Sequence, residues 1–276
     1  MILPYAEVIG DPVAHSKSPL IHGFWLQKLG IKASYDRCRV ASEGLGDYFA
    51  ARREDDAWQG CNVTIPLKES VMPHLDGIED VVRAIGAVNT VFREDSGGLR
   101  GTNTDIDGAA EALVGANSDG PVVVIGNGGA ARAAFAHLAR TGSGDVRILA
   151  RDPEKALRVA ADCGLAARAF PFDTEADLFK GAAIVVNATQ LGMHDQPAMP
   201  DWICDGLDRT DARALVFDMV YAPLETPLLA AARAAGRKPA DGLVMLVGQA
   251  AAAFERFFGS AAPRDHDAEL RAILTA

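Results

Sequence analysis

The stretch VVVIGNGGAARAAF, residues 122–135, constrains the fold of this chain more than any other part of its sequence. Its continuous apolar run is typical of a strand covered on both faces, and the alanine-rich segment after it predicts a helix. Between them Gly126, Gly128 and Gly129, with Ala131 in the last place, match the spacing G-x-G-x-x-G/A. Small residues there let the backbone approach a pyrophosphate at a helix N-terminus. The motif therefore predicts a dinucleotide site; the alternative is a tight turn that merely requires glycine.

The alternation of strand-like and helix-like segments continues after the glycines. The expected strands are 145–151, 182–189 and 214–220, and the expected helices are 108–116, 130–142, 153–164 and 224–236. Strands that alternate with helices pair in parallel through right-handed crossovers. This part of the chain is therefore predicted to be a Rossmann-type doubly wound α/β domain.

The N-terminal part also alternates between strand and helix. Its expected elements are strands at 5–10, 33–40 and 60–66, helices at 18–30 and 43–54, and a hairpin around Ser96-Gly97. Ser18 is expected to cap the helix at 18–30, with Pro19 at its first position. Pro66 is expected to begin a further helix that carries Lys68 in its first turn. These elements predict a second α/β domain.

The length of 276 residues exceeds what one hydrophobic core usually serves, which favours two domains. An apolar helix at 242–259 is expected to return to the core of the first domain, and a charged helix at 265–276 ends the chain. We therefore expect a substrate-binding α/β domain at 1–105 plus 241–276. The dinucleotide-binding domain is expected at 106–240.

Composition excludes several classes of partner. A net charge of −10 with scattered basic residues argues against nucleic acid and anionic membranes, although a local pocket can still bind a small anion. The four cysteines lie far apart without zinc-ligand spacing, so we expect no metal site and free thiols in a reducing compartment. The N-terminus lacks the basic region of a signal peptide, and no apolar run approaches the ~20 residues of a membrane helix. We expect a cytoplasmic protein with a small-molecule substrate.

The end of the second predicted strand of the dinucleotide domain bears on the choice of cofactor. NAD enzymes usually have an acidic residue there, which accepts a hydrogen bond from the ribose 2′-hydroxyl. This chain has Ala150, Arg151 and Asp152, with Lys155 one turn further. The two cations suit a 2′-phosphate and favour NADP, whereas Asp152 suits a free hydroxyl and leaves NAD possible. The structural alternative is that Arg151 and Lys155 are solvated surface residues.

Four polar clusters stand at predicted element ends of the N-terminal domain. They are Ser16 with Ser18; Asn62, Thr64 and Lys68; Asn89 with Thr90; and GTNTDIDG at 101–108, which contains Asp105. Each has a structural alternative as a helix cap, a strand residue or a solvated charge. Because ligands bind at the strand ends of α/β sheets, the clusters together predict a pocket for a polyhydroxylated acid. Lys68 and Asp105 can exchange a proton with a hydroxyl that becomes a ketone, as a nicotinamide takes the hydride.

These motifs, taken in order, resemble the shikimate dehydrogenase family along nearly the whole chain. The segments that carry the resemblance are AHSKSPLIH (14–22), NVTIPLKE (62–69), GAVNTV (86–91), GTNTDIDG (101–108), GNGGAAR (126–132), NAT..GM (187–193), DMVY (218–221) and DGLVMLVGQAA (241–251). The resemblance implies a two-domain enzyme that reversibly reduces 3-dehydroshikimate to shikimate with NADPH. It places the reaction in aromatic amino acid and chorismate biosynthesis.

The resemblance also implies roles for individual residues. Lys68 and Asp105 would be the catalytic pair. The expected substrate-binding residues are Ser16, Ser18, Thr64, Asn89, Asp105, Tyr221 and Gln249. The expected cofactor-binding residues are Gly126, Asn127, Gly128, Gly129, Ala130, Ala131, Ala150, Arg151, Asp152, Lys155, Met219, Gly242 and Asp80.

Two other functions stay open at this point. The family often has Asn-Arg-Thr where this chain has Ala150-Arg151-Asp152, which leaves a quinate/shikimate dehydrogenase with NAD or dual cofactor use as one alternative. A non-catalytic dinucleotide-sensing module is an alternative of another class. Such a module would keep the glycines but would not need Lys68 and Asp105 together. The chain is expected to be a monomer or a homodimer.

Overall fold

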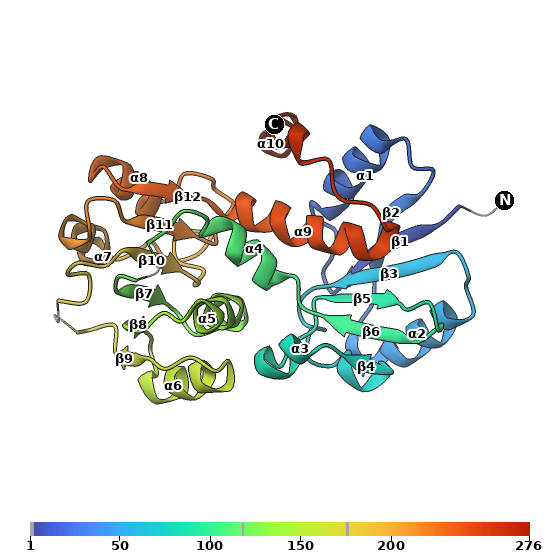
Figure 1. Cartoon of the computed structure of the whole chain (residues 1–276), viewed down its shortest axis with the longest axis horizontal. Coiled ribbons are helices and arrows are strands. Elements are labelled where there is room, and N and C mark those ends of the chain that lie inside the picture. The colour runs from blue at the N-terminus through green and yellow to red at the C-terminus, as the bar shows by residue number, and fades with distance from the viewer. Residues whose placement is uncertain (1–2, 118, 175–176) are drawn as a thin grey trace. The chain divides into compact units, whose positions relative to one another are not determined.

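The computed structural model of the chain describes residues 3–117, 119–174 and 177–276, which form two compact units (Figure 1). The first unit contains the residues up to Thr104 together with Gln249–Ala276, and the second contains Asp105–Gly248. Each unit is built on one six-stranded sheet, so the α/β fold class is confirmed. The division of substrate and dinucleotide between the two parts of the chain stays a prediction at this point.

The sheet of the first unit is mixed, with the strand order β2-β1-β3-β5-β6-β4. β1 pairs in parallel with both β2 and β3, whereas β5 is antiparallel to β3 and to β6. The hairpin predicted around Ser96-Gly97 is therefore confirmed. The strands are β1 (Tyr5–Gly10), β2 (Ser34–Arg39), β3 (Trp58–Val63), β4 (Gly77–Ile78), β5 (Thr90–Arg93) and β6 (Leu99–Thr102).

Helices cover both faces of this sheet, with α1 and α2 on opposite sides (Figure 1). The helices of the first unit are α1 (Ser18–Leu29), α2 (Leu45–Arg53), α3 (Asp80–Ile85), α10 (Asp267–Thr275) and the second part of α9 (Gly242–Phe258). On the α1 side, His22, Trp25 and Phe254 form an aromatic cluster whose members are fully buried. From Gln249 onward, α9 thus packs into the core of the first unit.

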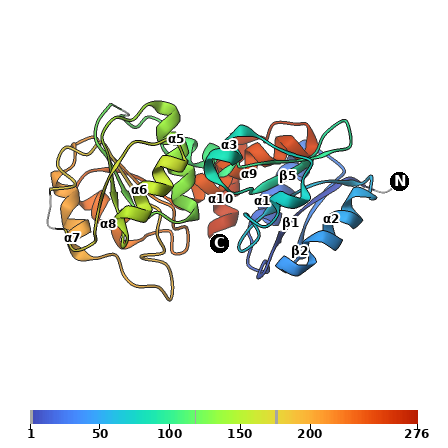
Figure 2. The same cartoon turned by 90° about the horizontal axis from the view of Figure 1, so that it is seen from below.

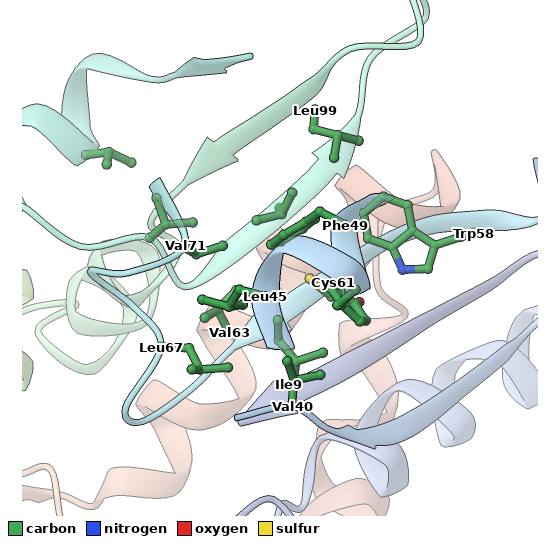
Figure 3. Packing of buried hydrophobic residues seen from close by; sticks show 14 residues of the cluster. Ile9, Val40, Leu45, Phe49, Trp58, Cys61, Val63, Leu67, Val71 and Leu99 are labelled. Atoms are coloured by element: carbon green, nitrogen blue, oxygen red, sulfur yellow. The ribbon is translucent and has the colours of Figure 1, made fainter. Parts of the chain in front are cut away.

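The α2 side of the sheet carries a second buried hydrophobic cluster (Figure 3). Leu45 and Phe49 from α2 pack there with strand residues such as Cys61. Leu67 and Val71, from the segment after β3, enter the same cluster and are fully buried. The core therefore anchors the backbone on both sides of Lys68.

The helix predicted to begin at Pro66 is wrong, because residues 65–71 form a series of turns. Val71 N–H donates to the Leu67 carbonyl as in a helix, at 3.0 Å. The Lys68 carbonyl instead accepts from Val88 N–H, at 2.8 Å, in the loop before β5. A helix would need that carbonyl for its own next hydrogen bond, so the contact with the neighbouring loop ends the helical turn.

The second unit has the parallel strand order β12-β11-β10-β7-β8-β9. Starting from β9, this is the order 3-2-1-4-5-6 of doubly wound dinucleotide-binding sheets. The strands are β7 (Val122–Ile125), β8 (Val146–Leu149), β9 (Arg168–Phe170), β10 (Ile184–Asn187), β11 (Leu215–Asp218) and β12 (Lys238–Ala240). The Rossmann-type fold predicted from the sequence is therefore confirmed.

Helices cover both faces of this parallel sheet as well. They are α4 (Asp105–Ala112), α5 (Gly129–Thr141), α6 (Pro153–Asp162), α7 (Asp201–Gly206), α8 (Pro227–Ala234) and the first part of α9. α5 and α6 lie on one face and α7 and α8 on the other, and in Figure 2 α6 lies in front of the strands. The order of the strands reverses direction between β7 and β10, so the ligand crevice of the fold lies at the carboxyl ends of these two strands. No helix in the described residues is both long and apolar enough to cross a membrane.

Candidate functional site

The glycine loop after β7 combines one tightly packed glycine with two open ones. Gly126 has a φ of 101°, and a Cβ there would lie 2.6 Å from Cγ2 of Thr189, in the loop after β10. Gly126 therefore brings the loops after β7 and β10 together at the switch point of the sheet. A Cβ at Gly128 or Gly129 would meet no described atom within 4 Å. Packing does not explain these two glycines, whereas a ligand phosphate on the first turn of α5 does.

The remaining residues of the loop differ in exposure. Ala130 is exposed, and Ala131 is fully buried beneath the first turn of α5. Asn127 has its Nδ2 enclosed without a hydrogen-bond partner among the described residues. Since an enclosed donor without an acceptor costs free energy, an oxygen-rich ligand at this loop would relieve that cost. The loop therefore fits a dinucleotide pyrophosphate.

The loop between β8 and α6 carries the residues expected at the adenosine end of the cofactor. Ala150 is buried and donates its N–H to Phe170, while the Arg151 and Lys155 side chains are exposed. Asp152 is the N-cap of α6, and its Oδ1 accepts from Lys155 N–H at 2.9 Å. The cap gives Asp152 a structural role that needs no ribose. The exposed cations beside it fit a 2′-phosphate.

A buried polar cluster joins the ends of β10 and β11. Asp218 is fully buried and accepts three hydrogen bonds, from Asn187 Nδ2 at 2.9 Å, Val220 N at 3.1 Å and Thr226 Oγ1 at 2.6 Å. Burial raises the pKa of Asp218, and these three donors only partly offset the effect. Asn187 in turn accepts from Thr189, so the cluster fixes both loops at the crevice of the sheet.

Met219 and Gly242 lie against one another at the same end of the second unit. A Cβ at Gly242 would clash with the Met219 carbonyl group, and Gly242 N–H donates to the Val220 carbonyl at 3.1 Å. Gly242 therefore permits a close backbone approach that no other residue allows. Tyr221, two residues beyond Met219, is 38 % exposed.

The serines before α1 are bonded to one another. Ser18 is the first residue of α1 rather than its cap, and Ser16 Oγ accepts from its N–H at 3.3 Å and contacts its Oγ at 3.2 Å. The expected capping role of Ser18 is thus wrong, because the hydroxyl two residues earlier receives that N–H. Lys17 reaches in another direction and donates to the carbonyl of Leu274.

The loop from β3 to Lys68 is fixed close to the end of β1. Thr64 N–H donates to the Ile9 carbonyl at 2.9 Å, and Thr64 Cγ2 fills the space that a side chain at Gly10 would need. With Leu67 in the core and the Lys68 carbonyl bonded to Val88, the backbone around Lys68 has little freedom.

Asn89, just before β5, and Thr104, just after β6, share three hydrogen bonds. Asn89 Oδ1 accepts from Thr104 N at 2.7 Å and from Thr104 Oγ1 at 3.2 Å, and Asn89 Nδ2 donates to Thr104 Oγ1 at 3.1 Å. Asp105 follows directly and is the first residue of α4. The structure thus places Asn89 beside the backbone that leads into Asp105.

Two further predicted residues lie on helices. Gln249 is on α9, and Asp80 begins α3, where its exposed carboxylate lies 3.6 Å from Arg83. Within the described parts of the chain, no group of three or more His, Cys, Asp or Glu side chains could hold a metal ion. All four cysteines are free thiols.

Sequence reasoning missed several residues that hold these loops. Thr104, Asn187 and Asp218 lie within segments already singled out as motifs, and their positions at strand ends were the signal that could have identified them. Tyr35, on β2, donates to Asn62 on β3 at 2.6 Å. It had no such signal, because a tyrosine in an alternating strand is ordinary.

Comparison with known proteins adds independent information. Family models match residues 8–91 (shikimate dehydrogenase substrate binding domain), 109–219 (shikimate / quinate 5-dehydrogenase) and 242–269 (shikimate 5'-dehydrogenase C-terminal domain). A shikimate dehydrogenase (NADP(+)) of Sphingopyxis alaskensis is 47% identical, over 99% of this chain and 97% of the relative.

Two solved structures are also similar over nearly the whole chain. Shikimate 5-dehydrogenase of Thermus thermophilus, in complex with NADP(H) and shikimate, has a TM-score of 0.83 at 36% identity and covers 99% of each chain. Shikimate 5-dehydrogenase of Listeria monocytogenes, in complex with shikimate and NAD, has a TM-score of 0.88 at 29% identity, over 99% of this chain and 96% of its own.

Proposed function

Since this chain belongs to the shikimate dehydrogenase family, we propose that Lys68 and Asp105 are its catalytic pair. The chain is an oxidoreductase that reversibly reduces 3-dehydroshikimate to shikimate with NADPH, a step of aromatic amino acid biosynthesis. The observation that supports the residue assignment is the fixed set of strand ends in the first unit. There Thr64, Asn89 and the backbone before Asp105 are held by buried contacts.

The two units divide the work of binding in this proposal. The proposed substrate ligands are Ser16, Ser18, Thr64, Asn89, Asp105, Tyr221 and Gln249. The hydroxyls and amides of these residues suit a polyhydroxylated carboxylic acid, because each can bond a ligand hydroxyl or carboxylate oxygen.

The second unit binds the dinucleotide in this proposal. The glycine loop and the first turn of α5 hold the pyrophosphate, and the exposed Arg151 and Lys155 hold the 2′-phosphate of NADP. Met219 and Gly242 are proposed at the nicotinamide end. Asp80, on α3 of the first unit, is a separate proposed cofactor contact. NADPH, when bound, supplies the hydride that reduces the C3 carbonyl.

The side chains of Lys68 and Asp105 supply the proton to the reduced substrate oxygen in this proposal. As the C3 carbonyl is reduced, negative charge develops on its oxygen, and the Lys68 ammonium stabilises that charge and donates a proton to it. The Asp105 carboxylate orients the lysine and accepts a hydrogen bond from the neighbouring substrate hydroxyl. In the reverse direction Lys68 removes the hydroxyl proton as the hydride leaves.

Steady-state kinetics of Lys68→Ala test the assignment, with the absorbance of the nicotinamide as the signal. We expect kcat for shikimate oxidation to fall by ~10² or more, as for the loss of a general acid–base group, and the KM for shikimate to change little. Lys32→Ala, at an exposed position before β2, is the control. A Lys68→Ala enzyme with wild-type turnover would refute the assignment.

Asp152 supports one alternative, a quinate/shikimate dehydrogenase with NAD or dual cofactor use. Its carboxylate caps α6, and its second oxygen can accept from a ribose 2′-hydroxyl. Rates with both acids and both nicotinamides distinguish this activity from a strict NADP enzyme. The dinucleotide-sensing module remains the alternative of another class, and it predicts no turnover of either acid. We further propose that the enzyme acts in the cytoplasm as a monomer or homodimer.

A further inference from the structure

A line of buried hydrogen bonds crosses the first unit and leads to a proposed substrate ligand, Asn89. Its members, in order, are Tyr35, Asn62, Thr90, Asn89 and Thr104. The first three, Tyr35, Asn62 and Thr90, are at most 6% exposed. They have no assigned part in the reaction, yet they connect β2 to Asn89.

Two backbone groups determine which side of each asparagine amide donates and which accepts along this line. Asn89 Oδ1 lies 2.7 Å from Thr104 N–H, which can only donate, so the oxygen of this amide must face Thr104. Asn62 Nδ2 lies 3.4 Å from the Asn89 carbonyl oxygen, which can only accept, so the nitrogen of this amide faces β5. Asn62 Oδ1 then faces β2, where the Tyr35 hydroxyl donates to it at 2.6 Å.

Thr90 connects the amides of Asn62 and Asn89 through hydrogen bonds of fixed donor and acceptor. Its hydroxyl accepts from Asn62 Nδ2 at 2.9 Å and donates its only proton to Asn89 Oδ1, also at 2.9 Å. Asn89 Oδ1 is thereby held by Thr90 and by Thr104. The nitrogen of Asn89 is left as the donating side of its amide, which is the side that suits a substrate hydroxyl or carboxylate oxygen.

The surroundings of Tyr35 keep its hydroxyl in place as a donor. The His22 ring stacks on the Tyr35 ring with centroids 3.9 Å apart and planes at 3°. Burial raises the pKa of Tyr35 well above its usual value. The phenol therefore keeps its proton and donates it to Asn62 Oδ1.

We propose that Tyr35 is a positioning residue of the substrate site, which orients Asn89 through Asn62 and Thr90. The inference rests on the proposed function, because Asn89 is proposed there as a substrate ligand. Loss of the Tyr35 hydroxyl leaves the Asn62 oxygen without its donor, and both amides lose a constraint on their rotation. Substrate binding should suffer, and dinucleotide binding in the second unit should not.

The test compares Tyr35→Phe with a matched control, Tyr48→Phe. Tyr48 is also buried in the first unit and donates at 2.7 Å, but to Glu7, on the α2 side of the sheet. We expect Tyr35→Phe to raise the KM for shikimate about fivefold to tenfold, as the loss of one buried hydrogen bond would, and to leave the KM for NADP within about twofold. Tyr48→Phe should change neither KM by more than about twofold.

A double-mutant cycle tests the route through Thr90. Thr90→Val removes the hydroxyl and keeps the shape, and Thr90→Ser restores the hydroxyl. If Tyr35 acts through Thr90, the KM of Tyr35→Phe/Thr90→Val should match that of Thr90→Val alone, and Thr90→Ser should behave as wild type.

Three outcomes would overturn the inference. The first is that the effects of Tyr35→Phe and Thr90→Val on the KM for shikimate multiply in the double variant. The second is that Tyr35→Phe raises the KM for shikimate and the KM for NADP equally. The third is that Tyr35→Phe and Tyr48→Phe have the same KM for shikimate. A wild-type chain that fails to oxidise shikimate with NADP would instead overturn the proposed function, and this inference with it.

Discussion

Gly10 and Thr64 pack so closely that a Cβ on Gly10 would lie 2.5 Å from Thr64 Cγ2 and 3.0 Å from the Ile65 carbonyl oxygen. Gly10 ends β1, and Thr64 begins the loop that leads to Lys68. The absence of one side chain on β1 therefore determines where this loop can lie.

Gly10→Ala is expected to displace Thr64 and the backbone before Lys68. Overpacking of this kind costs ~1–3 kcal/mol of stability, and a displacement of ~1 Å at a catalytic group can cost up to ~10² in rate. We expect kcat/KM for shikimate to fall at least ~10-fold. Gly46→Ala, within α2 where only His74 lies near at 3.8 Å, is the control and should keep wild-type kinetics with equal or higher stability. Wild-type kinetics in Gly10→Ala would contradict the prediction.

Asp152→Ser separates two effects of Asp152: the cap of α6 and the negative charge beside the proposed cofactor site. Serine can still accept from Lys155 N–H, so the free energy of unfolding should stay within ~0.5 kcal/mol of wild type. Removal of the negative charge should lower the KM for NADP ~2-fold or more and raise the preference for NADP over NAD. Asp152→Ala should change the kinetics in the same way but lose ~1 kcal/mol in urea unfolding. An unchanged cofactor preference in both variants would show that Asp152 serves the helix alone.

His22 should make the protein less stable in mild acid. Burial lowers the pKa of His22 to about 3, so the folded protein holds it neutral while the unfolded chain protonates it below its ordinary pKa of 6.5. The unfolded state then binds more protons, and stability falls as the pH drops through that window. Integration over one proton gives a loss of ~2 kcal/mol between pH 7.5 and pH 5.

His22→Phe fits the same aromatic cluster without a titrating group. Urea unfolding of both proteins at pH 7.5 and pH 5 should show a loss that is ~2 kcal/mol smaller in the variant. Parallel pH dependences in the two proteins would mean that His22 is not the group responsible.

Asp218→Ala should be among the most destabilising changes in the second unit. It leaves Asn187, Val220 N–H and Thr226 without their common acceptor in a buried site, at a cost of ~3 kcal/mol or more. Asp205→Ala, on the exposed side of α7, should stay within ~0.5 kcal/mol of wild type. Thermal or urea unfolding of the two variants gives the comparison, and equal stability would show that the buried carboxylate contributes nothing.

Elements set by local pattern were predictable from the sequence. The run VVVIG and its glycines predicted β7, the loop and α5, because a doubly covered strand and a phosphate-binding turn each require particular residue types nearby. The three-residue strands β9 and β12 were missed, since segments that short have no periodicity of their own.

The errors near the candidate site come from contacts between distant segments. Lys68 was expected in a helix, and the helix fails because its carbonyl bonds to Val88, twenty positions along the chain. Tyr35 and Asn62 meet across 27 positions in the same way, and nothing local marks their hydrogen bond. Sequence patterns thus pointed to the strand ends where the chemistry is proposed, whereas the buried bonds that hold those ends depend on the completed fold.

The chain leaves the first unit at Thr104 and re-enters it within α9, at Gln249. During synthesis, the N-terminal segment therefore emerges long before Phe254, which completes the cluster of His22 and Trp25. Until then the aromatic face of α1 has no cover from α9. The second unit, uninterrupted in sequence, can complete its core first although its synthesis begins later.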